Sequence, residues 1–198
     1  HPGDMAESVA LASVESPNIT YTPNLPAEVI KSGKLSLLQL EAVVYAGQAH
    51  GQKLPSGETR GFMIGDGTGV GKGREISGII MDNMRQGRTK AVWISKNNEL
   101  FIDAVRDWTA IGGDKNQIFP LSKIKKGQPI THKSGIVYLS YGVLKNGLSL
   151  SRGDILESSN DARIDQLVNW LGTDFDGVIA FDECHEMGNA LPIKSVRG

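Results

Sequence analysis

Two short polar segments of this sequence have the residue types, and the order, that nucleotide chemistry requires. The first covers residues 65–73 and reads G-D-G-T-G-V-G-K-G. The second, much later in the chain, is Asp182-Glu183-Cys184-His185. Each follows a short apolar run that is typical of a buried strand. Together they predict a site for a nucleoside triphosphate, with a cradle for phosphates and an acidic pair for metal and water.

The glycine-rich segment is suited to binding phosphate. A tight turn that leads into a helix points several backbone N–H groups at one place, where the helix N-terminus adds partial positive charge. Glycines permit positive φ and keep side chains away from the phosphates, while Lys72 reaches the β- and γ-phosphates. The predicted nucleotide-binding residues are Gly67, Thr68, Gly69, Val70, Gly71, Lys72, Gly73 and Arg74.

Two positions depart from the usual phosphate-loop pattern. Its first glycine is replaced by Asp66, and the Ser or Thr that follows the lysine is replaced by Gly73. That missing hydroxyl normally binds Mg²⁺, so Gly73 affects the metal site more than the phosphate cradle. We therefore expect Mg²⁺ to be held mainly by the nucleotide, water and the acidic segment. The alternative is a glycine-rich turn without a ligand.

The acidic pair is predicted to project from the carboxyl end of a strand at residues 178–181, which is where ligands bind in open α/β sheets. Asp182 is expected to hold Mg²⁺ through water, and Glu183 to orient and deprotonate the attacking water. His185 is expected to link the site to the rest of the domain. Lys72, Asp182 and Glu183 are thus the predicted catalytic residues. The alternative is a solvated acidic turn.

The elements that must position these segments follow from the apolar pattern. Continuous apolar runs predict strands at residues 62–64, 91–94, 118–119, 136–139 and 178–181. Helical spacing predicts helices that begin at Ser36 and that cover 76–84, 101–108 and 164–171, with Gly87 as a stop and Asn97 or Asn98 as a cap. Strands that alternate with helices predict an α/β fold, a mostly parallel sheet with helices on both faces.

Composition limits the class of protein. The 198 residues are 39% apolar and 22% charged, values that fit a globular domain with a sizeable core. A net charge of −1 excludes nucleic-acid binding through bulk charge alone, although one basic face is compatible with it. Cys184 is the single cysteine, which excludes an internal disulfide. No apolar run is long enough to span a bilayer and no signal peptide is visible, so we expect an intracellular location.

Proline placement predicts how the chain is divided. Four of the eight prolines, Pro2, Pro17, Pro23 and Pro26, fall within residues 1–35, which we expect to form an extended lead-in. Residues 36–198 are expected to form the α/β domain. The chain begins at His1 and stops soon after the acidic segment, and we interpret it as a piece of a longer protein.

Both motifs resemble those of one protein family. D-G-T-G-V-G-K is similar to the D-E-x-G-x-G-K loop of Snf2-type motors in helicase superfamily 2. G-D-G-T-G-V-G-K-G-R together with F-D-G-V-I-A-F-D-E-C-H resembles the strawberry notch family of helicase-like NTPases, in which Gly73 belongs to the pattern. The resemblance covers most of the chain, including residues 40–48 and 93–95.

This resemblance implies the first RecA-like domain of a P-loop NTPase that uses ATP and Mg²⁺ and acts on nucleic acid, with DNA favoured. It also implies a partner, the second RecA-like domain of the parent chain, which supplies an arginine worth roughly 10³–10⁵ in rate in related NTPases. Because that domain is absent from this sequence, we expect the chain alone to bind nucleotide weakly and to hydrolyse it slowly or not at all.

The resemblance implies roles for further residues. Gln39 lies where such motors use a glutamine to recognise adenine; the alternative is a solvated helix residue. Two groups follow strands where these motors contact a nucleic-acid backbone, namely Ser95, Lys96 and Asn97, and Ser140 and Tyr141. The alternative is that these five are ordinary caps and loop residues.

Three functions remain open at this point. The first is an ATP-binding and hydrolysing motor domain of a helicase-like protein that acts on DNA. The second is a regulatory or protein-interaction module that binds nucleotide without productive hydrolysis, which the missing hydroxyl at Gly73 favours. The third, a P-loop phosphotransferase, is disfavoured because no acceptor site is visible and an acidic pair suits water activation.

Overall fold

The chain divides into two compact units. A computed structural model describes residues 15–67, 69–145 and 162–187. One unit comprises His1–Gly87 and Arg106–Gly113, and we call it the helical unit. The other comprises Arg88–Val105 and Asp114–Gly198, and we call it the sheet unit.

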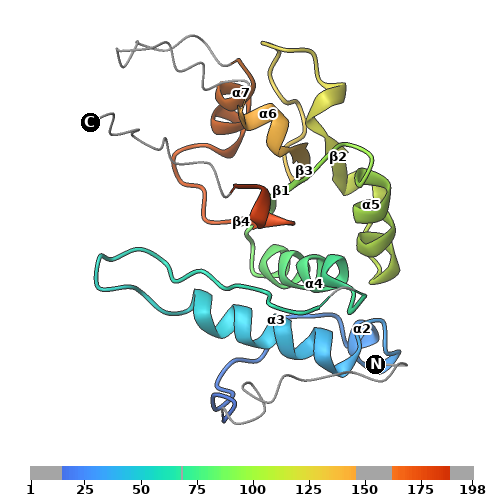
Figure 1. The fold of residues 1–198 in the computed structure, drawn as a ribbon, viewed down its shortest axis with the longest axis vertical. Coiled ribbons are helices and arrows are strands. Elements are labelled where there is room, and N and C mark those ends of the chain that lie inside the picture. The colour runs from blue at the N-terminus through green and yellow to red at the C-terminus, as the bar shows by residue number, and fades with distance from the viewer. Residues whose placement is uncertain (1–14, 68, 146–161, 188–198) are drawn as a thin grey trace, which may run out of the picture. The chain divides into compact units, whose positions relative to one another are not determined.

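The sheet unit is built on four parallel strands (Figure 1). These are β1 (Lys90–Ser95), β2 (Ile118–Pro120), β3 (Gly135–Ser140) and β4 (Val178–Phe181), in the spatial order β2-β3-β1-β4. Val92 of β1 lies opposite Val137 of β3 and Ile179 of β4. Because the strands are parallel, the residues that follow them meet at one edge of the sheet.

Helices and short 3₁₀ turns connect these strands. They are α5 (Phe101–Ala110), which crosses into the helical unit, then η1 (Lys115–Gln117), η2 (Leu121–Lys123), α6 (Tyr141–Lys145), α7 (Ala162–Leu171) and η3 (Cys184–Met187). The Asn97 side chain caps α5 by accepting from the N–H groups of Glu99 and Leu100. One apolar core cluster joins Val92, Ile94, Phe119, Leu121, Val137, Leu139, Tyr141, Leu167 and Trp170.

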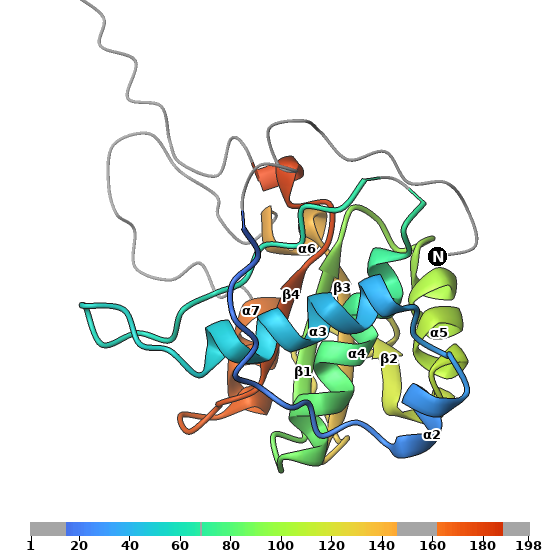
Figure 2. The ribbon, with the colours of Figure 1, turned by 90° about the horizontal axis from the view of Figure 1, so that it is seen from below.

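The helical unit contains α2 (Ala27–Lys31), α3 (Leu37–His50) and α4 (Lys72–Arg85), and α3 lies alongside α4 (Figures 1 and 2). Ser36 starts α3 with a capping box, in which its hydroxyl accepts from the Gln39 N–H. Gly78 of α4 allows close packing, since a Cβ there would lie 2.6 Å from Val43 Cγ2. Gly87 adopts φ 92° just after α4 and ends it, as predicted.

The described part of the lead-in is bound to the helical unit. The Tyr21 ring covers Gly47 so closely that a Cβ on this glycine would overlap it. The Tyr21 hydroxyl donates to Asp82 Oδ2 at 2.6 Å, and the Asn24 N–H donates to Oδ1 at 2.5 Å. Residues 15–26 are irregular, but Ala27–Lys31 is helical rather than extended, because Val29 faces the core and is 2% exposed.

Most of the predicted elements are confirmed, and so is the α/β class with a parallel sheet. One predicted strand is wrong: residues 62–64 are irregular, with Phe62 38% and Met63 79% exposed. A strand exists only through a ladder partner, and within the described residues the sheet contains β1 to β4 alone. No helix in the described ranges is long and apolar enough to cross a membrane.

Asp82 provides a test of the lead-in contact. It is 1% exposed, and a hydrogen bond to a buried carboxylate contributes about 1.5–3 kcal/mol. We therefore expect Tyr21→Phe to lower the free energy of unfolding by about 2 kcal/mol in urea denaturation. Tyr45→Phe is the matched control, because its hydroxyl donates to the exposed carbonyl of Pro17 at 3.2 Å. Equal losses for the two variants would contradict the prediction.

Candidate nucleotide-binding site

The predicted phosphate loop lies in the helical unit and leads directly into α4. Gly71 is the N-cap residue of α4 with φ 96°, and Gly69 has φ 90°. Both angles lie in the left-handed region that favours glycine, so the glycines are needed for the course of the loop. Thr68 lies outside the described residues. The arrangement of a glycine turn before a helix N-terminus is therefore present as predicted.

Lys72 is turned back over its own loop. Its Nζ donates to the carbonyl of Asp66 at 3.1 Å and to that of Gly67 at 3.4 Å. An incoming phosphate offers a charged acceptor, which makes a stronger hydrogen bond than a carbonyl does. The ammonium group is thus held at the loop by contacts that a phosphate can replace.

Gln39 connects the start of α3 to the phosphate loop. Its Nε2 donates to the Val70 carbonyl at 2.8 Å, and its Oε1 accepts from the Ser36 N–H at 3.0 Å. The side chain is 6% exposed, which excludes the alternative of a solvated helix residue. Arg74, another predicted nucleotide contact, donates to the Lys34 carbonyl at 3.3 Å.

Gly73 faces a carboxylate that sequence reasoning missed. A Cβ built on Gly73 would overlap Oδ2 of Asp107 and lie 3.0 Å from its Cγ. The Asp107 side chain is only 15% exposed, so little space is open for it to move away. A side chain at this position would therefore require the Asp107 side chain, a neighbour from α5, to move. No local motif marks Asp107, because the contact joins two helices far apart in sequence.

Glu75 is a second carboxylate that the sequence analysis missed. It lies in the first turn of α4 and is 0% exposed, and its carboxyl group lies within hydrogen-bonding reach of the Asp66 carboxyl. Burial, and next the nearby Asp66 carboxyl, raise the pKa of Glu75 to about 8, while Lys72 acts in the opposite direction. The available signal was its spacing, four residues before Ile79, on the buried side of α4.

Asp182 lies directly after β4 and is fixed from two neighbouring strands of the sheet unit. Its N–H donates to the Ile94 carbonyl at 2.8 Å, and its carboxylate accepts from Ser95 Oγ at 3.0 Å. Its carbonyl accepts from the Tyr141 hydroxyl at 2.9 Å. Burial, followed by Cys184 and the acidic side chains, raises the pKa of Tyr141 to about 12, so the phenol remains a donor at physiological pH.

The turn after Asp182 gives Glu183 an unusual backbone. Its φ is 52°, a conformation that costs a non-glycine residue roughly 1–2 kcal/mol. The carboxylate is 42% exposed, and His185 Nδ1 lies 3.3 Å from its Oε2. Strained backbone conformations persist where the surrounding structure holds them in place. Three hydrogen bonds fix Asp182, the residue directly before Glu183.

The residues predicted to contact nucleic acid surround this acidic turn. Ser95 and Tyr141 are buried against Asp182, and Ser140 is 8% exposed. The Lys96 side chain is 57% exposed, and its Nζ lies 3.1 Å from Glu186 Oε1. Asn97 caps α5, as the alternative interpretation stated, and its carbonyl accepts from the Tyr138 hydroxyl at 2.8 Å.

Comparison with known proteins decides the family. A model described as "P-loop containing NTP hydrolase pore-1" matches residues 1–198. The chain is 43% identical to protein strawberry notch of Drosophila melanogaster over 98% of its own length and 12% of that protein. It is 45% identical to human strawberry notch homolog 2 and 39% identical to FORGETTER 1 of Arabidopsis thaliana, covering 13% and 14% of them. This chain belongs to the strawberry notch family of P-loop NTP hydrolases.

The chain matches only a small part of its strawberry notch relatives. It spans about 10% to 16% of their lengths. No solved structure matches it significantly. The α/β fold with a phosphate loop, inferred above from residue patterns and local geometry, is the fold that this family of NTP hydrolases implies.

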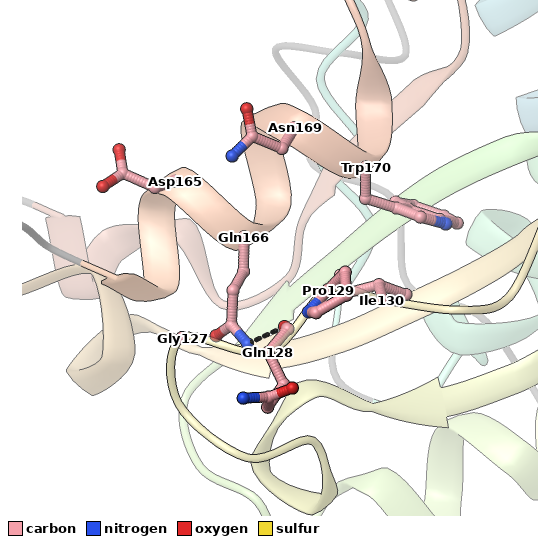
Figure 3. Close-up of a pocket in the computed structure, with 8 residues that line it drawn as sticks. All are labelled: Gly127, Gln128, Pro129, Ile130, Asp165, Gln166, Asn169 and Trp170. Atoms are coloured by element: carbon pink, nitrogen blue, oxygen red, sulfur yellow. Dashed lines mark hydrogen bonds between the residues drawn. The ribbon is translucent and has the colours of Figure 1, made fainter.

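The sheet unit also has a hollow of about 390 Å³, and Figure 3 shows the residues that line it. The loop at residues 127–130 forms one side of it, and Asp165, Gln166, Asn169 and Trp170 of α7 form the other. Lys90, which begins β1, donates to the carbonyl of Trp170. The Trp170 end of the hollow therefore lies near the amino ends of the strands, whereas Asp182 follows a carboxyl end.

The described residues fit a metal that arrives with a nucleotide rather than a site built from protein alone. Within those residues, no group of three or more His, Cys, Asp or Glu side chains could hold a metal ion. Mg²⁺ usually takes one or two carboxylates, with phosphates and waters as its other ligands. Asp182, fixed and half-buried, is suited to that limited role.

The raised pKa of Glu75 predicts a pH dependence of stability. The folded chain binds this proton with a pKa of about 8, against an ordinary value of 4.5 for glutamate. The stability that the protonated carboxyl contributes is therefore full below pH 4.5 and is lost as the pH rises toward 8. Relative to the unsubstituted chain, Glu75→Gln should gain about 1.4 kcal/mol per pH unit across this window.

Urea denaturation from pH 5 to pH 8 measures this difference. Glu41→Gln, on an exposed site of α3, is the matched control. A stability difference for Glu75→Gln that does not change with pH would contradict a raised pKa at this carboxyl.

The Tyr141 bond predicts a second stability change. Tyr141→Phe leaves the Asp182 carbonyl without its donor, at a cost of about 1–3 kcal/mol in the free energy of unfolding. Thermal denaturation followed by circular dichroism measures the loss. An unchanged melting temperature would mean that the hydroxyl does not hold the acidic turn.

Proposed function

We propose that this chain binds ATP with Mg²⁺ and hydrolyses it as the first RecA-like domain of a helicase-like protein that acts on DNA. One observation carries the proposal: a lysine that ends a loop of left-handed glycines lies at the N-terminus of α4, in a chain that matches a family of P-loop NTP hydrolases throughout. The acidic pair after β4 supports hydrolysis rather than binding alone.

Each predicted residue has a distinct role in this proposal. The loop amides and Lys72 bind the phosphates, Gln39 braces the loop or contacts adenine, and Asp182 receives Mg²⁺ through water. Bound Mg²⁺ would neutralise phosphate charge during transfer. Glu183 takes a proton from the attacking water, and His185 Nδ1, 3.3 Å away, orients that carboxylate. Ser95 and Tyr141 keep Asp182 in place.

Contact with nucleic acid is proposed for the same edge of the sheet. Lys96 is the exposed cation of the five residues assigned to it, and a DNA phosphate would compete with Glu186 for its ammonium group. Ser140 is the last residue of β3, and Asn97 follows the end of the neighbouring strand β1, so we assign both to this surface. Ser95 and Tyr141 would act through Asp182.

The parent protein completes the proposed activity. The chain covers a small part of its relatives, so we propose that a second RecA-like domain of the parent chain supplies the arginine that fast hydrolysis needs. Residues 36–198 are proposed as the first domain. We also propose an intracellular location. A second candidate is a regulatory module that binds nucleotide without hydrolysis. Gly73, which lacks the metal-binding hydroxyl, favours this alternative.

Calorimetric titration with ATP and ADP, with and without Mg²⁺, tests the binding part of the proposal. Lys72→Ala should weaken ATP binding at least tenfold, because the variant loses the ammonium that neutralises phosphate charge. Lys31→Ala, at an exposed site at the end of α2, is the matched control and should bind as the unsubstituted chain does. Equal affinity of all three proteins would refute a phosphate site at this loop.

The catalytic part is decided in the parent protein, where Glu183→Gln separates the two candidates. The motor domain predicts DNA-stimulated turnover that this variant loses while it retains ATP binding. The regulatory module predicts no turnover before or after the substitution.

A further inference from the structure

We propose that Asp107 holds the nucleotide-bound Mg²⁺ in place of the Ser or Thr that follows the lysine in other phosphate loops. The carboxylate of a neighbouring helix would then replace the missing hydroxyl at Gly73. This inference rests on the proposed function, since the metal would arrive with ATP. It assigns a metal-binding role to Asp107 and explains why a glycine follows the lysine in this loop.

The geometry at Gly73 is the first argument. A side chain at position 73 would begin where Oδ2 of Asp107 already lies, since a Cβ built there overlaps that oxygen. In the usual loop the metal-binding hydroxyl is one bond beyond this Cβ. An acceptor oxygen therefore occupies the region in which the usual loop places its metal ligand, although it comes from α5 rather than α4.

The charges around the loop are the second argument. The Asp66 carboxyl group lies near Lys72 and near the fully buried Glu75, whose pKa of about 8 leaves it mostly protonated and uncharged at neutral pH. Asp107 adds a third carboxyl group beside the same helix end. Carboxylates at a phosphate site would repel the ligand unless a cation lies between them. A divalent ion that comes with the phosphates would lie between the negative charges of the phosphates and those of the carboxylates, and would attract both.

Asp107 is held in position but weakly paired. The next residue, Trp108, is 2% exposed, and its carbonyl accepts from the Gly113 N–H at 3.0 Å, which anchors this end of α5. Arg106 reaches the carboxylate only at 3.3 and 3.4 Å, longer than the 2.7–2.9 Å of a strong charge-assisted bond. Mg²⁺, which prefers carboxylate and phosphate oxygens, can take the place of this contact.

The test compares ATP affinity with Mg²⁺ and with EDTA, so that the effect of the metal is separated from that of the loop. Asp107→Asn keeps the size of the side chain and removes its charge. In the unsubstituted chain, Mg²⁺ should raise the affinity for ATP above that measured in EDTA. We expect the ratio of these two affinities to fall at least tenfold in Asp107→Asn, while the affinity for metal-free ATP stays equal or rises. Asp103→Asn, one turn earlier on α5, is the matched control and should keep the full gain.

A ligand exchange makes the test sharper. Asp107→Ala alone should lose the gain from Mg²⁺, and Gly73→Ser alone should weaken nucleotide binding because the new side chain meets Asp107. The double variant Gly73→Ser with Asp107→Ala has both the hydroxyl and the space for it, and should recover the gain. With Mn²⁺ in place of Mg²⁺, the electron paramagnetic resonance spectrum of the bound Mn²⁺–ATP should change in Asp107→Asn.

Each remaining outcome contradicts a different claim. Asp107→Asn with the normal gain from Mg²⁺ would overturn the metal role of Asp107 and leave the nucleotide site intact. Equal loss of affinity with and without Mg²⁺, in a variant with normal circular dichroism, would assign Asp107 to loop structure instead. No saturable, Lys72-dependent ATP binding by the unsubstituted chain would overturn the proposed function itself, and this inference with it.

Discussion

The parallel pairing of β1 with both β3 and β4 is the constraint on which the acidic turn depends. Parallel register brings the ends of these strands to one edge, so that Ser95, Tyr141 and Asp182 meet although they are far apart in sequence. Three hydrogen bonds then fix Asp182, and the chain enters Glu183 with a positive φ. A slip of one residue in either pairing would remove these contacts together, because alternate residues face opposite sides of a sheet.

The phosphate loop depends on a different kind of constraint, namely packing between helices. Gln39 from α3 holds the loop through the Val70 carbonyl, and Asp107 from α5 occupies the space beside Gly73. The loop is therefore shaped by two helices as well as by its own glycines. A buried carboxyl group, that of Glu75, also lies near Lys72, and burial raises its pKa to about 8.

Sequence reasoning succeeded where a repeating apolar pattern was strong. The runs at β1, β3 and β4 and the spacing along α4 and α7 each identified an element, since buried faces recur at fixed intervals. The run at residues 62–64 has the same composition as a strand, but composition contains no information about a ladder partner. Asp107 and Glu75 were missed for a related reason: their importance comes from burial and from contacts across helices, which no local spacing encodes.

The contact between the lead-in and Asp82 bears on where this domain begins. Leu25, Val29 and Leu35 all precede α3 and are buried. A protein trimmed to start at Ser36 would lose these side chains from its core, together with the two donors that Tyr21 and Asn24 give to the buried Asp82 carboxylate. The described residues before α3 therefore contribute buried side chains and hydrogen bonds to the helical unit, in addition to those of residues 36–198.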